Sequence, residues 1–360
     1  MDVYERGARD LAMHLDPYRL KVTMPFIYHP AVLHAMSAVR RVVALRPGLM
    51  TLYAASFTFA AVEILRAIRR NSDLSRRFDG IREVVLAGAL IGGAPIVALI
   101  SGNLTPYLHL LILGCALRYE RLRARKSALL FVTVVGVTCV VKPYLLSYCA
   151  LYWILFEPRW RIPAAVGSCA IFLVLWIAGE FIWPVEYAAF KVALEKATLQ
   201  VNDLGYAYFG MVHSFIPSMS ISMALHAMLA VTLLYLALFI APQRLGLRGS
   251  PFLRILLAIP FVILTNPRMK EYDWFLGVIC CLLLAGLSLR NYARAILVLS
   301  ALPVLVTWWF LVHHGIQASS LNYGMGQMAS FLIFLSLFVW IRLEQTADRQ
   351  AISSTTSEPA

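Results

Sequence analysis

Long apolar runs, about eleven of them, recur along the chain between short polar linkers. Several are shorter than the roughly 20 residues of a straight transmembrane helix, so we expect half-helices, re-entrant pieces or spans extended by polar flanks. No run alternates apolar and polar residues as the strands of a membrane barrel do. The pattern predicts an all-α integral membrane protein, a multi-pass helical bundle with runs at residues 48–68, 84–100, 104–117, 128–141, 145–156, 164–183, 221–241, 252–264, 274–289, 295–312 and 328–341.

Composition agrees with this class. Apolar residues make up 60% of the 360 residues and charged residues only 14%, against roughly 45–50% and 25% in soluble domains. All six cysteines lie inside apolar runs, where cysteine behaves as a small hydrophobic residue, so we infer neither disulfides nor a metal site. The net charge of +13 could indicate a nucleic-acid partner, but its distribution explains it better, and we expect none.

The positive residues are concentrated in every second linker. Those after the first, third, fifth, seventh, ninth and eleventh runs carry Arg66, Arg69, Arg70, Arg76, Arg77 and Arg82; Arg118, Arg121, Arg123, Arg125 and Lys126; Arg159 and Arg161; Arg244 and Arg248; Arg290 and Arg294; and Arg342 and Arg349. The positive-inside rule places these linkers in the cytoplasm. We therefore expect an outer-face segment at 1–47 with interfacial helices, a transmembrane domain at 48–342 with an outer loop at 184–220, and a disordered cytoplasmic tail at 343–360.

On the outer face, Lys142 ends an apolar run and is followed by Pro143, which cannot continue a regular helix. The lysine either extends to the membrane interface or points into a cavity opened by the break. The stretch 266–273 repeats the pattern, with Arg268, Lys270, Glu271 and Asp273 between two apolar runs. Such cations suit an anionic ligand, since Arg binds phosphate oxygens in a bidentate manner.

The N-terminal segment is too polar to span a membrane. Its apolar spacing predicts an amphipathic helix at the membrane surface, and residues 31–45 predict a second one. It offers acids, tyrosines and a histidine: Asp2, Asp10, Asp16, Tyr4, Tyr18, Tyr28 and His29. These groups beside a cation-rich pocket would form a sugar-transfer site, although a solvated loop with a few acids has the same composition.

The order of these motifs resembles a known family. D-V-Y at residues 2–4, D-P-Y at 16–18, F-I-Y-H-P at 26–30 and a G-N turn at 102–103 are followed by K-P at 142–143, R-W-R at 159–161 and N-P-R-x-x-E-Y-D at 266–273. The order is similar to that of the polyprenol-phosphate-mannose-dependent glycosyltransferases of the GT-C class, glycosyltransferase family 87, which includes mycobacterial α-(1→2)-mannosyltransferases. The resemblance covers most of the chain.

The resemblance implies an inverting hexosyltransferase, multi-pass in the cytoplasmic (inner) membrane, with its site facing the periplasm or exterior. Its partners would be a polyprenyl-phosphate sugar donor, a glycolipid or glycan acceptor and membrane lipid. Asp2 or Asp16 would act as general base, and Lys142, Arg268 and Lys270 would hold the donor phosphate. Asn103, Tyr28 and His29 would line the sugar or acceptor site, with Tyr4, Tyr18, Glu271 and Asp273 as further substrate-binding residues. Because the chain has no D-x-D triplet, we expect no metal and no cofactor.

The chain departs from the family at its start. Family members begin with a transmembrane helix before the aspartate-bearing loop, whereas this sequence starts inside that loop. Residues 1–47 carry seven Lys and Arg residues. Their export without a preceding span would oppose the rule that positive residues stay in the cytoplasm. We therefore expect a first helix, and with it the true catalytic aspartate, upstream of Met1.

Two other classes stay open. Broken helices and charges in the membrane also suit a lipid or oligosaccharide transporter or flippase, although we find no internal repeat. A polysaccharide ligase with a lipid-diphosphate donor would share the topology. Glu63, inside an apolar run, either packs between helices with a hydrogen-bond partner or faces a cavity, and residues 185–201 predict an amphipathic helix within the outer loop.

Overall fold

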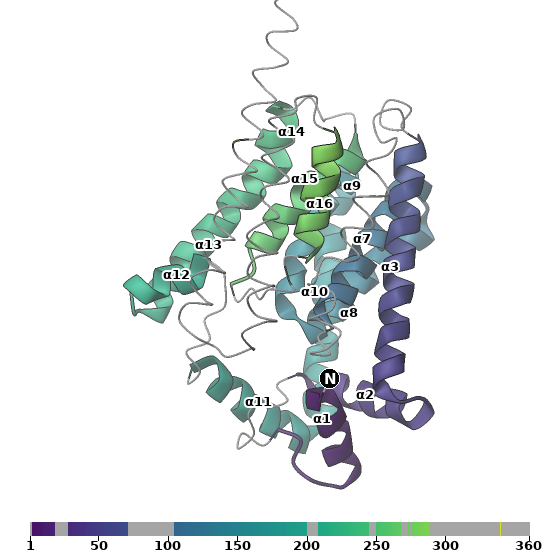
Figure 1. Ribbon diagram of the computed structural model, residues 1–360. Coiled ribbons are helices and arrows are strands. Elements are labelled where there is room, and N and C mark those ends of the chain that lie inside the picture. Colours follow the sequence, from purple (N-terminus) through teal and green to yellow (C-terminus); the bar gives the residue numbers. More distant parts are fainter. Residues whose placement is uncertain are drawn as a thin grey trace, which may run out of the picture. The chain divides into compact units, whose positions relative to one another are not determined.

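The computed structural model describes residues 2–18, 28–70, 104–199, 208–244, 250–267, 273, 275–287 and 339. The chain divides into two compact units, Met1–Leu65 with Pro95–Asp203 and Arg66–Ala94 with Leu204–Ala360. The described part of both units is helical and contains no strand (Figure 1). The predicted all-α class is therefore confirmed for these residues.

Three described helices are long and apolar enough to cross a membrane: Pro47–Arg70, Pro158–Ile182 and Met219–Gln243. Each corresponds to a predicted run. Shorter apolar helices at Pro143–Leu155 and Pro251–Leu264 also match predicted runs. The runs at 84–100 and 295–312, nearly all of 328–341, and the tail lie outside the described residues, so the count of eleven segments stays a prediction.

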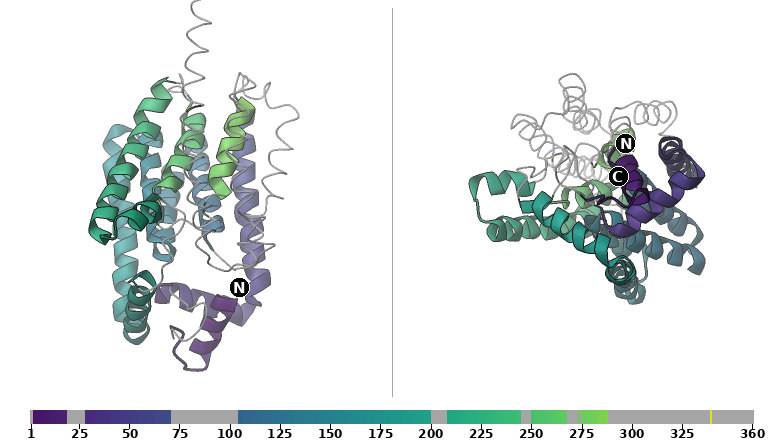
Figure 2. Two further views of the ribbon diagram at one scale, coloured as in Figure 1. Left: turned by 60° about the vertical axis from the view of Figure 1, so that its left-hand side comes forward. Right: turned by 90° about the horizontal axis from the view of Figure 1, so that it is seen from below.

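The first unit begins with the two predicted surface helices, α1 (Asp2–Ala12) and α2 (Pro30–Val42). Figure 2 shows α2 running across the end of α3 (Leu45–Arg70). The second helix is shorter than predicted, because Val43 takes an extended conformation (φ −149°, ψ 149°) and Leu45 already begins α3. Pro47 suits this first turn, where a missing N–H costs nothing.

Two helices of this unit run in the same direction, α8 (Arg125–Val141) and the span-length α10 (Pro158–Ile182). Ser168 donates a 2.8 Å hydrogen bond to the carbonyl of Val132, and one turn later Gly136 faces Ile171. A Cβ at Gly136 would lie 2.8 Å from the Ser168 carbonyl, so the close approach of the helices requires glycine there. The helix α7 (Thr105–Leu122) precedes α8 and contacts it.

The short apolar run predicted at 145–156 connects the end of α8 back to the start of the parallel helix α10. It forms a 3₁₀ helix, η1 (Pro143–Leu151), and a single turn, α9 (Tyr152–Leu155). The hydroxyls of Tyr152 and Ser168 share a 2.6 Å hydrogen bond that ties this return to α10. The prediction that the run is not an ordinary span is confirmed.

The predicted outer loop at 184–220 contains two helices, α11 (Pro184–Leu199) and α12 (Tyr208–Phe215). The first confirms the helix predicted at 185–201 and belongs to the first unit. There its buried Tyr187, Phe190 and Ala193 join one apolar core with residues of α1, α2, α3 and α7. The surface helices are thus packed into the unit through α11.

The second unit contains α12, α13 (Met219–Tyr235), a π-helical segment η2 (Leu236–Ile240), α14 (Ala241–Arg244), α15 (Pro251–Leu264) and α16 (Phe275–Leu287). Helix α15 is its core element, because every residue from Ile255 to Leu264 is buried. The Nε2 atom of His226 lies 2.9 Å from the carbonyl of Thr265 and links α13 to the end of α15.

Candidate functional site

Lys142 lies where α8 stops. Its own N–H still bonds to the carbonyl of Thr138 (3.1 Å), but its backbone is extended (φ −144°, ψ 97°) and Pro143 starts the 3₁₀ helix. Proline has no N–H and cannot extend the α-helical ladder. The break therefore holds a half-buried ammonium group at the C-terminal end of a helix, where the helix dipole favours positive charge.

The side chain of Lys142 meets the N-terminal segment. Its Nζ atom lies 5.1 Å from the centroid of the Tyr28 ring, a cation–π contact between residues far apart in the sequence. Within the described part of the chain, Lys142 has no carboxylate partner. An ammonium group held by an aromatic face keeps its N–H donors for an anion, so this pair, the Lys142–Tyr28 contact, is the centre of the candidate site.

His29, predicted to line the substrate site, is instead buried. Its Nδ1 accepts the N–H of Ala31 (3.2 Å) and so caps α2, and its Nε2 donates to the carbonyl of Trp176 (3.2 Å). These two bonds require the neutral imidazole with its proton on Nε2. Burial lowers the pKa of His29 and favours the same form. The residue therefore anchors the segment that carries Tyr28.

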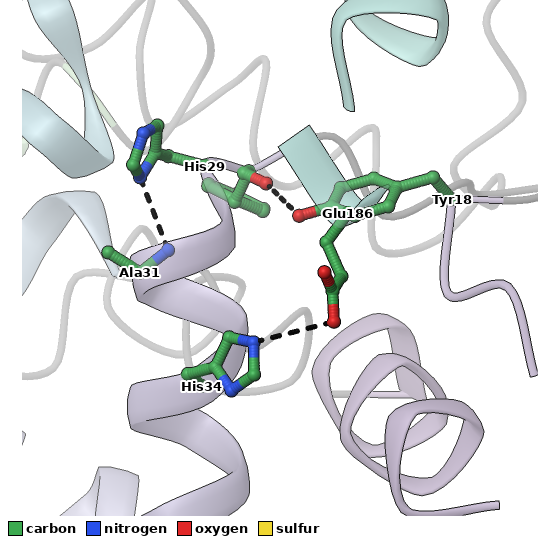
Figure 3. A network of polar contacts seen from close by, with 6 residues as sticks. Tyr18, His29, Ala31, His34 and Glu186 are labelled. Atoms are coloured by element: carbon green, nitrogen blue, oxygen red, sulfur yellow. Dashed lines mark hydrogen bonds and ion pairs between the residues drawn. The ribbon is translucent and has the colours of Figure 1, made fainter. Parts of the chain in front are cut away.

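Tyr18 holds the same segment through a hydrogen bond of its hydroxyl (Figure 3). Its hydroxyl donates a 3.0 Å hydrogen bond to the carbonyl of Tyr28, and its ring is buried. Burial, with the nearby carboxylates of Glu186 and Asp16, raises the pKa of Tyr18, so the phenol stays neutral. Its role in the structure is to fix the backbone beside Lys142.

The predicted catalytic acids lie in the same unit. Asp16 is exposed, and its Oδ1 accepts the N–H of Tyr18 (2.8 Å). Asp2 and Tyr4 lie in the first turn of α1, but their side chains are outside the described part. Asp10, also in α1, is buried.

The other predicted site residues lie elsewhere. Asn103, Arg268, Lys270 and Glu271 fall outside the described residues. Asp273 belongs to the second unit, where it is buried and accepts a 3.2 Å hydrogen bond from the side chain of Asn266. The meeting of these groups with Lys142 in one pocket stays a prediction.

One pair of ionisable groups in the first unit was not predicted from the sequence. The Nε2 atom of His34 on α2 lies 3.8 Å from Oε1 of Glu186 on α11 (Figure 3), and its ring stacks on Trp183 with centroids 4.6 Å apart. Both side chains are partly exposed, 31% for His34 and 25% for Glu186. Burial lowers the pKa of His34, Glu186 raises it, and Arg41 lowers it further, with a net decrease. No local signal connects α2 with α11, because the pairing is set by their packing alone.

No model of a protein family matches this chain, and no characterised protein matches it either. The resemblance to glycosyltransferase family 87 therefore stays an interpretation of the motifs. Among the described residues, no group of three or more His, Cys, Asp and Glu side chains is placed to hold a metal ion.

Proposed function

We propose that the protein is a membrane glycosyltransferase of the GT-C kind that acts at the outer face of the membrane. It transfers a hexose, with mannose as the first candidate, from a polyprenyl-phosphate carrier to a glycolipid or polysaccharide acceptor, with inversion at the anomeric carbon. The proposal rests on the motif order in the sequence. It is supported by helices of transmembrane length and by surface helices packed against one end of the first unit.

The observation that carries the proposal is the Lys142–Tyr28 contact. Lys142, predicted to hold the donor phosphate, and Tyr28, predicted to line the sugar or acceptor site, are more than a hundred residues apart in the sequence. Their side chains place a cation and an aromatic ring together at a helix break. A purely structural lysine at the interface would not need the buried support that Tyr18 and His29 give to Tyr28. A lipid-linked phosphate is an anion that reaches such a place from within the membrane.

In the proposed reaction, the acceptor hydroxyl oxygen attacks the anomeric carbon as the bond from that carbon to the phosphate oxygen breaks. The bonding electron pair leaves with the polyprenyl phosphate, and the hydroxyl proton passes to a carboxylate base. Lys142 contributes because negative charge grows on the phosphate oxygens as the bond breaks, so a fixed cation binds the transition state more strongly than the ground state. Asp16, exposed beside Tyr18, is the described candidate for the base, and Asp2 is the alternative.

The test is a donor assay on the purified full chain in lipid nanodiscs. Labelled polyprenyl-phosphate mannose and labelled polyprenyl-diphosphate sugar are offered separately, each with a membrane glycolipid extract. Release of polyprenyl monophosphate together with a labelled glycolipid or glycan supports the proposal. Use of the diphosphate donor alone would identify a polysaccharide ligase instead. In sealed proteoliposomes, passage of intact donor across the bilayer without product would identify a transporter.

A further inference from the structure

The ends of the first unit differ in charge. The turn between α7 and α8 meets the turn between α9 and α10: the rings of Tyr119 and Phe156 stack with centroids 4.5 Å apart, and Arg123 donates to the carbonyl of Leu155. Since α8 and α10 run in the same direction, both helices begin here, and Lys142 lies at the other end of α8. We call the cationic residues gathered here the basic end: Arg118, Arg121, Arg123, Arg125, Lys126, Arg159 and Arg161.

Some of these cations already have partners. Arg121 forms a bidentate ion pair with the buried Glu63 (2.9 and 3.1 Å), Arg161 donates to the carbonyl of Phe156 (3.1 Å), and Arg159 pairs with Glu157 on the surface (2.9 Å). Arg125 and Lys126 are exposed and have no carboxylate partner among the described residues. The basic end therefore retains an excess of exposed positive charge.

The positive charge at the start of α8 is unfavourable unless an anion lies near it. Helix N-termini are positive and are stabilised by acidic residues. Helix α8 has no acidic residue at its N-cap or in its first turn, and α10 has only Glu157 at its N-cap, whose charge is offset by the ion pair with Arg159. Arg125 and Lys126 lie in the first turn of α8 and Arg159 lies in that of α10, and the two helices pack against each other. A phosphate group would offset both the side-chain charges and the helix ends.

An apolar surface continues from these cations along the same two helices. Leu129 and Leu130 on α8 and Ile162 and Val166 on α10 are exposed, Ile162 by 66%. Because α10 has the length and composition of a membrane span, its exposed side chains, and those of α8 packed beside it, would meet acyl chains in a bilayer. Trp160, 54% exposed at the start of that span, has the position of an interfacial tryptophan.

We propose that the basic end is a binding surface for an anionic bilayer phospholipid. The headgroup phosphate lies among Arg125, Lys126 and Arg159, and the acyl chains follow the apolar face of α8 and α10. Cations next to an exposed apolar surface favour a phospholipid as the partner, because a free phosphate or a nucleic acid has no acyl chain that would contact the apolar side chains. This inference does not depend on the proposed transferase activity.

Phosphatidylglycerol is the probe that tests it. The purified full chain is exchanged into detergent containing equal amounts of phosphatidylglycerol and phosphatidylcholine, and the lipid that remains bound is measured by native mass spectrometry. The triple variant Arg125→Gln, Lys126→Gln, Arg159→Gln is compared with wild type. Lys191→Gln is the control, because Lys191 is also exposed but lies on α11, beyond the far end of α10. Thermal melting checks that every variant is folded.

We expect wild type and the control to retain phosphatidylglycerol in preference to phosphatidylcholine. In the triple variant, retention of phosphatidylglycerol should fall about fivefold or more, since even one lysine or arginine near an anionic surface contributes roughly that factor. Equal retention by wild type and a folded triple variant would overturn the proposal. So would equal retention of the two lipids by wild type, or full displacement of phosphatidylglycerol by millimolar inorganic phosphate.

Discussion

The imidazole of His29 fills the space that a side chain at position 179 would occupy. A Cβ atom on Gly179 would lie 2.3 Å from Cε1 and 2.5 Å from Nε2 of the ring, well inside van der Waals contact. The ring cannot easily move away, because its two nitrogens bond to Ala31 and to the carbonyl of Trp176. A glycine on α10 thus allows the N-terminal segment to attach to the end of this helix.

Gly179→Ala should therefore destabilise the protein by about 1–3 kcal/mol, the usual cost of overpacking a filled site. The matched control is Gly167→Ala on the same helix, where a Cβ would meet only Val132 at 3.3 Å. Alanine favours helix formation by up to about 1 kcal/mol, so this control should melt close to wild type. Thermal melting of both variants in detergent measures the difference. Equal melting temperatures would show that His29 moves aside at little cost.

Stability should decrease as the pH falls below the ordinary pKa of histidine. Burial lowers the pKa of His29 below the ordinary histidine value of about 6.5, so between the two pKa values the unfolded chain binds more protons than the folded chain. The stabilisation is complete above about pH 6.5 and is lost as the pH falls towards the folded-state pKa. Melting temperatures from pH 8 to pH 5 should show this decline.

The decline should be smaller in His29→Gln, which removes the titrating ring. His34→Gln separates the two groups, because the pKa of His34 is lowered as well and contributes in the same direction. A pH profile for His29→Gln as steep as that of wild type would assign the effect to other residues.

Removing one partner of the buried ion pair between Glu63 and Arg121 should cost more stability than removing both charges together. The side chain of Glu63 is 1% exposed and that of Arg121 is 20% exposed. Arg121→Met leaves a buried carboxylate that has lost its bidentate partner, at a cost of about 3 kcal/mol. The double variant Glu63→Gln, Arg121→Met should recover part of this loss, which a double-mutant cycle of melting measurements detects. Additive losses would contradict the coupling.

The sequence was sufficient where one local rule decides the structure. Pro143 cannot continue a helix, so the break after Lys142 follows from the chain alone. For Glu63 the sequence left two alternatives, a partner between packed helices or a cavity, and the structure shows the partner, Arg121. The alternation of basic linkers also predicted that the segments around 118–126 and 159–161 share one end, and the Tyr119–Phe156 stack joins them.

The sequence was not sufficient where packing between distant segments decides. His29 was predicted to line a substrate site, but three aromatic rings, Trp176, Tyr187 and Phe190, surround it, and Gly179 leaves room for it. The pairing of His34 with Glu186 depends on the contact between α2 and α11. Neither result has a signature in the spacing of the residues themselves.

The Lys142–Tyr28 contact has a geometric twin that separates a phosphate role from a packing role. Lys191 lies over the ring of Tyr187 at the same 5.1 Å, but it is exposed and pairs with Glu180 (3.2 Å). Lys142→Ala should lower kcat/KM for the polyprenyl-phosphate donor by about 10²–10³-fold, the usual loss when one preorganised charge-stabilising donor is removed. Lys142→Arg should retain part of the rate.

Lys191→Ala removes the same side chain and the same kind of cation–π contact, so it should leave the rate near wild type and shift the melting temperature as much as Lys142→Ala does. A loss of rate that follows the melting temperature in both variants would indicate that the contact only holds the segment in place. Wild-type turnover by a folded Lys142→Ala protein would remove Lys142 from the donor site. A loss of rate confined to Lys142→Ala, with equal melting temperatures in the two variants, is the result that the proposed phosphate contact requires.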